Sequence, residues 1–259
     1  MGVVPTNVLV LPCFNEERRL QPAMFLEFAE AHPETKLLFV DDGSTDSTAV
    51  VLEQLAADSG NVVQVLRVAH AGKAAAVRAG ILAALQSDPE LTGYVDCDLA
   101  TPLEELQHML SECRRLNADA VLGSRVGLVG HQIERSRSRH YLGRVFATAA
   151  SVVLGFRIYD TQCGAKVFAV TPALRAALAT PFTTDWTFDV ELLLRLRQID
   201  PGLALVEYPL HRWSDVRGSK LSGRHMLGAL FDLLRLGRAA RRERRKATLA
   251  PPAKTSPNQ

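Results

Sequence analysis

Short apolar segments alternate with longer amphipathic ones through the first half of the chain, a pattern typical of βαβ units around a parallel sheet. The apolar segments predict five strands, and the amphipathic segments between them predict four helices. The predicted strands cover Asn7–Leu11, Leu37–Val40, Val62–Val68, Gly93–Val95 and Ala120–Gly123. The predicted helices cover Glu16–Ala31, Ser47–Asp58, Gly72–Leu85 and Pro102–Leu116.

Helix start signals support two of these helices. Ser44 and Ser47 are candidate caps for the second helix, because their hydroxyls can accept from free backbone amides. Thr101 is the candidate cap of the fourth, and Pro102 and two glutamates follow it at the positive end of the helix dipole.

The pattern changes after Ser124. A polar, basic loop leads into less regular segments, and a polar, proline-rich end follows them. The elements predicted there are helices over Tyr141–Leu154, Phe188–Gln198 and Ser222–Arg238 and strands over Ala165–Val170 and Leu205–Tyr208. We therefore expect one α/β domain over residues 1–238 and a basic, disordered tail over residues 239–259.

Composition narrows the class of protein. The 259 residues are 47% hydrophobic and 22% charged, as in ordinary globular proteins. No segment reaches the roughly 18 apolar residues of a membrane span, and the N-terminus lacks the pattern of a signal peptide. None of the four cysteines forms a C-x-x-C pair, which favours reduced, intracellular thiols. The net charge of +2 conceals a basic segment, Arg235–Lys246.

Polar residues follow each of the first five predicted strands. Ligands of open α/β sheets bind at the carboxyl ends of strands, so these residues predict a site at one rim of the sheet. The segments are Pro12–Glu16, Asp41–Asp46, His70–Lys73, Asp96–Asp98 and Ser124–Arg125. Each also has an ordinary reading as turn chemistry. Neither G-x-x-x-x-G-K-[ST] nor G-x-G-x-x-G occurs at these turns, which disfavours a P-loop nucleotidase and a Rossmann dehydrogenase.

The pair Asp96 and Asp98 is the most informative of these segments. Residues two apart in a strand face the same side, so both carboxylates can approach one point where the strand ends. Like charges so close repel each other unless a cation lies near them, and hard divalent ions prefer carboxylate oxygens. The pair therefore predicts a site for a metal ion and a diphosphate.

The ordered segments LPCFNEE, FVDDGSTDST, GKAAAVRAG, VDCDLATP and LGSR resemble the nucleotide-sugar half of inverting GT-A glycosyltransferases of family 2. The later segments DTQCGAKVF, WTFDVELL and HRWSDVRGSKL are similar to those of dolichyl-phosphate glucosyltransferases and polyprenyl-phosphate mannosyl synthases. The resemblance covers about residues 6–236. It implies a single Rossmann-like, mostly parallel sheet flanked by helices, with a nucleotide-sugar half (about 6–125) and an acceptor half (about 126–238).

The resemblance also implies roles for individual residues. Asp98 would ligate Mg²⁺ or Mn²⁺, and Arg125, Arg217 and Lys220 would be the cations near the diphosphate and the acceptor phosphate. The residues implied to bind the nucleotide sugar are Pro12, Phe14, Glu16, Asp41, Lys73, Asp96, Cys97, Asp98 and Arg217. Ala100 stands where mannosyl-phosphate synthases have a glutamine, which favours UDP-glucose over GDP-mannose as donor.

The acceptor decides whether a catalytic base is needed. A polyprenyl phosphate is already an anionic nucleophile, so its transfer requires positioning and charge neutralisation by residues such as Asp98, Arg125 and Lys220. A hydroxyl of a soluble sugar or polysaccharide would need a base, for which Asp189 and Glu191 are the candidates. Acidic residues are also favoured in the first turn of a helix, where both could be purely structural. The sequence leaves the choice between a catalytic and a structural role open.

The basic segments bear on the location of the protein. Arginines near residues 135–144 and in the C-terminal helix flank apolar segments, which favours peripheral binding to an anionic membrane on its cytoplasmic face. A solvated basic tail is the alternative. No nucleic-acid partner is expected, because no recognition motif accompanies the arginines. A sugar-nucleotide sensor without activity is a further alternative, which the intact aspartate pair disfavours. The oligomeric state stays open.

Overall fold

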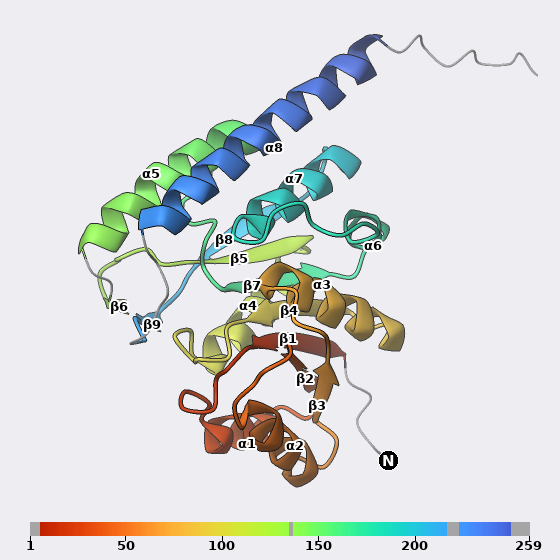
Figure 1. Cartoon of the computed structure of the whole chain (residues 1–259), viewed down its shortest axis with the longest axis vertical. Coiled ribbons are helices and arrows are strands. Elements are labelled where there is room, and N and C mark those ends of the chain that lie inside the picture. The colour runs from red at the N-terminus through yellow and green to blue at the C-terminus, as the bar shows by residue number, and fades with distance from the viewer. Residues whose placement is uncertain (1–5, 135–136, 217–222, 250–259) are drawn as a thin grey trace, which may run out of the picture.

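The computed structural model describes residues 6–134, 137–216 and 223–249. Figure 1 shows a central seven-stranded sheet with the order β3-β2-β1-β4-β7-β5-β8. Its strands are β1 (Asn7–Cys13), β2 (Thr35–Asp41), β3 (Val63–Arg67), β4 (Leu91–Val95), β5 (Ala120–Ser124), β7 (Ala165–Ala169) and β8 (Leu205–Pro209). All neighbouring strands are parallel except that β7 runs antiparallel to β4 and β5. The mostly parallel α/β class is therefore confirmed.

Helices cover both faces of the sheet. They are α1 (Pro22–Ala31), α2 (Thr48–Asp58), α3 (Lys73–Ala84), α4 (Leu103–Arg115), α5 (Arg137–Leu154), α6 (Pro172–Ala177), α7 (Phe188–Ile199) and α8 (Gly223–Leu249), with a short 3₁₀ helix η1 (Leu85–Ser87). One core joins the sheet to α3, α5, α6, α7 and α8. A second core joins the opposite face to α1, α2 and α4.

The alternation of side chains along β1 explains these two cores. Val8 and Val10 point to the side of α3, whereas Leu9 and Leu11 point to the side of α1. All four are buried, since a strand covered on both faces has no polar side. The apolar runs that predict the strands therefore reflect burial in the centre of a layered α/β domain.

A second sheet, separate from the central one, has two strands. It pairs β6 (Gln132–Glu134) with β9 (Arg212–Ser214) in parallel. Neither strand is predicted from the sequence, because three-residue strands carry too short a pattern to detect.

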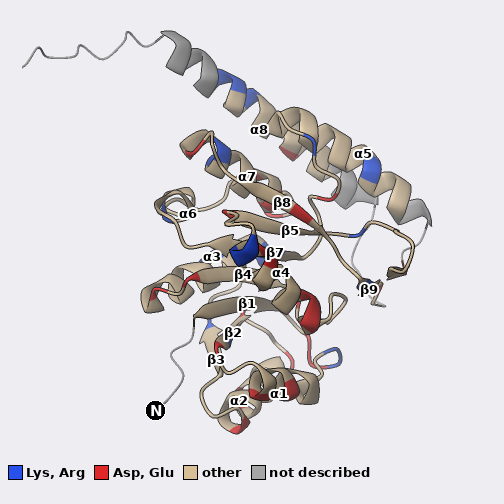
Figure 2. Ribbon diagram, turned by 180° about the vertical axis from the view of Figure 1, so that it is seen from behind, with Lys and Arg blue, Asp and Glu red and all other residues tan. Residues whose placement is uncertain are grey.

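Three predicted helix boundaries are wrong. The helix predicted over Tyr141–Leu154 already begins at Arg137. The first helix begins at Pro22 and not at Glu16, because the chain bends at residues 14–15, where Asn15 has a φ of 55°, and turns again at residues 17–19, where Arg19 N donates to Glu16 O at 2.8 Å. The last helix continues past Arg238 to Leu249, so residues 239–249 of the predicted disordered tail are helical. Arginine, lysine, alanine and leucine are strong helix formers, which accounts for the extension. Figure 2 shows basic residues along α8.

The predicted caps are also corrected. Asp46, rather than Ser44 or Ser47, accepts from the backbone of Thr48 at the start of α2, at 3.0 Å. The hydroxyl of Ser44 accepts instead from Asn15 N, at 3.0 Å. At the start of α4, Pro102 is the capping residue and no side chain caps the helix.

Candidate active site

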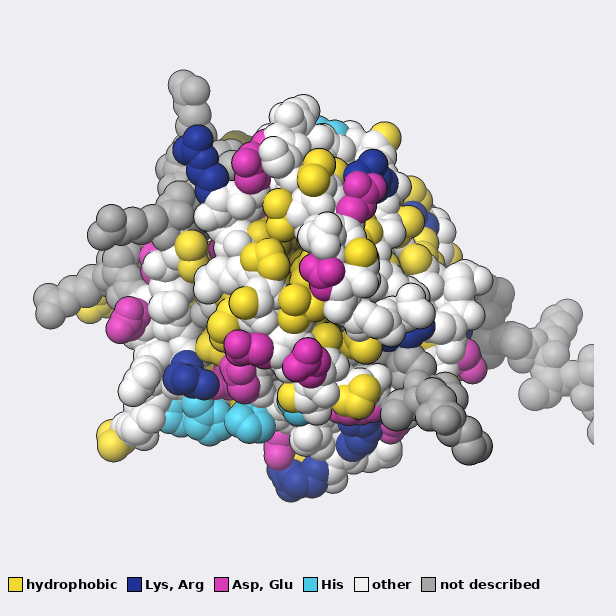
Figure 3. Space-filling view, turned by 90° about the horizontal axis from the view of Figure 1, so that it is seen from below, with side chains coloured by type: hydrophobic (Ala, Val, Ile, Leu, Met, Phe, Trp, Pro, Cys, Tyr) yellow, Lys and Arg dark blue, Asp and Glu magenta, His cyan; other side chains and the backbone are white. Residues whose placement is uncertain are grey.

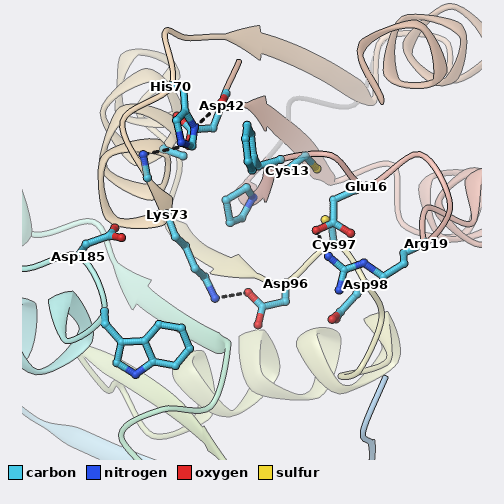
Figure 4. A pocket seen from close by; sticks show the side chains of 15 residues that line it. Cys13, Glu16, Arg19, Asp42, His70, Lys73, Asp96, Cys97, Asp98 and Asp185 are labelled. Carbon is cyan, nitrogen blue, oxygen red and sulfur yellow. Dashed lines mark hydrogen bonds and ion pairs between the residues drawn. The ribbon is translucent and has the colours of Figure 1, made fainter. Parts of the chain in front are cut away.

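A cavity of about 340 Å³ opens at the carboxyl ends of β1, β2, β3 and β4 (Figure 4). This is the rim at which the sequence places its polar residues. The cavity is lined by Pro12, Cys13, Phe14, Glu16, Arg19, Asp42, His70, Gly72, Lys73, Ala76, Asp96, Cys97, Asp98, Asp185 and Trp186. Seven of the predicted nucleotide-sugar residues are among them, namely Pro12, Phe14, Glu16, Lys73, Asp96, Cys97 and Asp98.

An aromatic pair lies on one wall. The rings of Phe14 and His70 stack, with their centroids 4.1 Å apart. His70 Nδ1 donates to Asp42, whose backbone oxygen is 3.0 Å away. The carboxylate of Asp42 also accepts from the backbone amides of Ala71 and Gly72, at 2.8 and 2.9 Å. Asp42 therefore holds the loop before α3 and, through it, the aromatic wall.

The predicted residue Asp41 does not line this cavity. Its Oδ1 accepts from Ser44 N at 3.0 Å, so it closes the turn after β2. Successive residues at a strand end face opposite ways, and the side chain that reaches the cavity is that of Asp42.

Lys73 and Asp96 form an ion pair across the cavity (Figure 4). Burial lowers the pKa of Lys73, but the negative charges of Asp96 and Asp189 outweigh it, so the pKa is raised overall. Lys73 is therefore protonated at neutral pH, beside Asp96 and Asp98, the two aspartates of the D-x-D segment.

Asp98 has the environment expected of a metal ligand. Burial and, after it, the charge of Asp96 raise the pKa of Asp98, against the opposing effects of Ala100 N and Arg19. A divalent cation would relieve this cost, and the carboxylates of Glu16, Asp96 and Asp98 all line the cavity. Oxygen ligands of this kind fit Mg²⁺ or Mn²⁺.

One glycine allows a close approach at this site. Gly72 has a φ of 92°, and a Cβ atom on it would lie 2.7 Å from Asp185 Oδ1. The same oxygen accepts from Ala74 N at 3.2 Å, in the first turn of α3. Asp185, in the loop before α7, therefore caps the start of α3.

Arg125 does not line the cavity. Its guanidinium makes two hydrogen bonds to the Asp160 carboxylate, at 2.6 and 2.8 Å, and lies over the Trp213 ring. The charge of Asp160 overcomes the effect of burial and raises the pKa of Arg125. Because β7 lies between β4 and β5, the end of β5 is two strand spacings, about 10 Å, from the end of β4.

Neither candidate base lines the cavity. Asp189 is buried, accepts from the Tyr94 hydroxyl and lies 3.3 Å from Lys166 Nζ. Glu191 accepts from the backbone amides of Thr183 and Thr184, at 2.9 and 3.0 Å. It also pairs with Arg195, so it fastens the loop before α7.

Sequence reasoning assigned no site role to eight of the fifteen residues that line the cavity. These residues are Cys13, Arg19, Asp42, His70, Gly72, Ala76, Asp185 and Trp186. Asp42 and His70 lie in segments that the sequence singles out, whereas Arg19 was assigned to a helix. The predicted site residues Arg217 and Lys220 lie outside the described residues.

Comparisons with known proteins agree with this architecture. Residues 8–173, more than half of the chain, match the model of the family Glycosyl transferase family 2. A dolichyl-phosphate beta-glucosyltransferase of Trichomonas vaginalis is 32% identical over 245 residues, which cover 89% of this chain and 70% of that protein. The polyprenol monophosphomannose synthase of Mycolicibacterium smegmatis is 28% identical over 251 residues, covering 95% and 93%.

Solved structures support the fold. The glucosyl-3-phosphoglycerate synthase of Mycobacterium tuberculosis superimposes with a TM-score of 0.66 at 16% identity, covering 91% of this chain and 80% of that one. Its complex with Mn²⁺, UDP and glucosyl-3-phosphoglycerate superimposes with a TM-score of 0.62 at 18% identity, with the same coverage of 91% and 80%. The cavity at the strand ends, with Asp96 and Asp98 inside it, agrees with these matches. The chain belongs to glycosyl transferase family 2 and is a hexosyltransferase of the GT-A fold.

Proposed function

We propose that this protein transfers a hexose from a nucleotide sugar to a polyprenyl phosphate, with inversion at the anomeric carbon. UDP-glucose is the favoured donor and GDP-mannose the alternative. Relatives that match 88–95% of the chain are named for dolichyl-phosphate glucosyl transfer and polyprenol phosphomannose synthesis. The two names differ in the sugar and share a lipid phosphate as acceptor.

The placement of the candidate bases is the observation that favours a phosphate acceptor. A sugar hydroxyl must lose its proton during attack, whereas a phosphate oxygen is already anionic. Asp189 contacts Tyr94 and Lys166, and Glu191 contacts the loop before α7, so both acids are engaged away from the cavity. A hydroxyl acceptor with Asp189 or Glu191 as base is therefore the less favoured function.

The donor would occupy the cavity at the ends of β1 to β4. Pro12 and Phe14 offer an apolar wall to the base, with Glu16 beside them. Asp41 acts through the turn that it closes, while Lys73, Asp96 and Cys97 lie where the diphosphate would pass. Asp98 would hold Mg²⁺ or Mn²⁺, and such an ion neutralises charge on the departing nucleoside diphosphate. The Mn²⁺ and UDP in the glucosyl-3-phosphoglycerate synthase complex support this assignment.

Transfer requires the acceptor phosphate to meet the anomeric carbon in line with the leaving diphosphate. An oxygen of the acceptor phosphate forms the new bond to C1 as the bond from C1 to the diphosphate breaks. The cation Lys73 can stabilise the leaving group. Arg217 and Lys220 are proposed to bind the acceptor phosphate, with Arg125 as a further cation near the phosphates.

We also propose peripheral attachment to the cytoplasmic face of an anionic membrane. In the part of the chain that the structure describes, no helix has the length and apolar character needed to cross a bilayer. Helices α5 and α8 lie side by side in Figures 1 and 2 and contact each other. They expose large apolar side chains at Tyr141, Leu142, Val145, Val152, Phe231 and Leu234. Exposed arginines follow on α8, as in interfacial helices.

One assay tests the proposed function. The protein is incubated with Mg²⁺ or Mn²⁺, a polyprenyl phosphate and, one at a time, labelled UDP- and GDP-sugars, and the product is extracted into organic solvent. We expect label in a lipid from which mild acid releases the sugar. Label that stays in the aqueous phase with an added soluble acceptor would favour the alternative.

A further inference from the structure

Three histidine rings and one buried carboxylate meet where α4 packs against β9. Figure 3 shows histidine side chains gathered in one patch on the face seen from below the molecule. The ring of His211 stacks on that of His131, with centroids 4.8 Å apart, and meets the edge of His108 at 5.8 Å. Glu105, one turn before His108 on α4, lies against the same group.

The backbone at the start of β9 fixes the Glu105 carboxylate in place. Its oxygens accept from the backbone amides of His211 and Arg212, at 3.1 and 3.0 Å. The side chain is only 4% exposed. A carboxylate with four lone-pair sites retains acceptor capacity after these bonds. Its Oε2 lies 3.5 Å from His211 Nδ1.

The spacing of the donor atoms matches that of a metal site. One ligand atom from each of Glu105, His108 and His211 lies within 4.8 Å of the other two, and no other such group of three occurs among the described residues. Two ligands at about 2.0–2.1 Å from a tetrahedral Zn²⁺ lie about 3.3 Å apart. The 3.5 Å between Glu105 and His211 is close to this value, so small rotations of exposed imidazoles would complete the site.

We propose that Glu105, His108 and His211 bind a divalent transition metal ion, with Zn²⁺ the best fit to two imidazoles and a carboxylate. Water would fill the fourth position, as in zinc sites with three protein ligands. None of these three residues lines the donor cavity, so the site is separate from Asp98. A bound ion would tie α4, which follows the D-x-D segment, to β9.

Two neighbours orient the proposed ligand His211. His131 Nδ1 donates to Leu210 O at 2.8 Å, which fixes the plane of the ring that stacks on His211. Such outer contacts orient metal ligands in known sites. The Tyr208 hydroxyl is 3.0 Å from His211 Nδ1 and competes with the metal for that nitrogen.

The test uses the full chain carrying Asp98→Asn, which removes the metal ligand of the donor cavity. Zn²⁺ binding is measured by calorimetry and by the rise in Tm, and Co²⁺ reports tetrahedral coordination through its visible absorption. We expect His108→Ala and His211→Ala to weaken Zn²⁺ binding at least tenfold and to abolish the Co²⁺ band. Tyr208→Phe should strengthen binding.

His32→Ala is the matched control. His32 Nδ1 lies 3.5 Å from Glu34 Oε1, the same separation as in the proposed site, but this pair belongs to no group of three ligands in the described structure. Its substitution should leave Zn²⁺ binding unchanged. The Tm of each apo variant establishes that it folds. The proposal is overturned if Zn²⁺ binds the His108→Ala and His211→Ala variants as tightly as the parent, or if the parent shows neither tetrahedral Co²⁺ nor a Zn²⁺-dependent Tm.

Discussion

Gly164 lies directly against the carboxylate of Asp96, and a Cβ atom on Gly164 would lie 2.1 Å from Asp96 Oδ2. The backbones are also joined, since Asp96 N donates to Gly164 O at 3.1 Å. Gly164→Ala should therefore displace the end of the Asp96 side chain while leaving the fold intact. A displacement of about 1 Å at a reacting centre costs about 10²-fold, so we expect kcat/KM to fall by that order with little change in Tm.

Gly127→Ala is the control for this substitution. Its Cβ atom would meet no other atom within 4 Å. Activity and Tm should match those of the parent protein. Equal activity of Gly164→Ala and Gly127→Ala would contradict the role assigned to the position of Asp96.

Asp98→Asn tests the proposed metal ligand. Loss of one carboxylate charge should weaken Mn²⁺ or Mg²⁺ binding and lower kcat by about 10²–10³-fold, the range for lost transition-state stabilisation. Asp88→Asn is the control, because Asp88 is an exposed acid paired with Arg175. Metal titrations of both variants check the expectation. Unchanged metal dependence in Asp98→Asn would count against the assignment.

Substitution of Glu191 separates a structural role from a catalytic one. Glu191→Ala leaves the amides of Thr183 and Thr184 and the Arg195 guanidinium without their acceptor, so the free energy of unfolding should fall by about 3 kcal/mol. Activity per folded molecule should change by less than about tenfold, whereas loss of a general base costs about 10²–10⁴-fold. Urea unfolding together with kcat at low temperature measures the two effects.

Asp189 and Lys166 predict a minimum in stability near pH 8. Burial raises the pKa of Asp189 from 3.8 to about 8, so the folded state holds this proton more tightly and stability falls as the pH rises between those values. Burial lowers the pKa of Lys166 from 10.5 to about 8, so stability rises again between pH 8 and 10.5. Urea unfolding across this pH range measures the free energy of unfolding as a function of pH. Asp189→Asn should abolish its fall below pH 8, and Lys166→Met should abolish its rise above pH 8. A falling limb that persists in Asp189→Asn would refute the assignment.

Membrane attachment predicts a specific effect of charge on α8. Replacing exposed Arg241 and Arg242 by alanine should weaken binding to anionic liposomes by about 2 kcal/mol, or roughly 30-fold, since each cation contributes about 1 kcal/mol. The matched control replaces Arg67 and Arg115, which pair with Glu53 and Glu112. Flotation of the protein with anionic liposomes should be lost only in the variant that lacks Arg241 and Arg242. Removal of residues 238–259 without effect would exclude a role for this segment.

The pattern of the first half of the sequence was sufficient to predict β1 to β5 and the rim they share. Strands such as β1, buried on both faces, give continuous apolar runs, and polar turns mark their ends. Seven of the predicted donor residues consequently line one cavity. Lys73 and Asp96, 23 residues apart, follow the consecutive strands β3 and β4 and form an ion pair there.

The pattern of apolar and polar residues along the chain could not predict features that depend on packing between residues far apart in the sequence. The insertion of antiparallel β7 between β4 and β5 separates Arg125 from the cavity, and nothing local to Arg125 records it. Which of Asp41 and Asp42 reaches the cavity depends on which side chain closes the turn after β2, and that side chain is Asp41. The capping of α3 by Asp185 joins residues 111 positions apart.

The most direct test compares two acceptors that differ only in the phosphate. Transfer of labelled glucose from UDP-glucose, and of labelled mannose from GDP-mannose, is measured with a polyprenyl phosphate and with the polyprenol of the same chain length. If the acceptor is a phosphate, which needs no base, only the polyprenyl phosphate should yield labelled lipid. Asp189→Asn should then lower the rate of transfer by less than about tenfold. Transfer to the polyprenol, or to neither lipid with either donor, would contradict the proposed function.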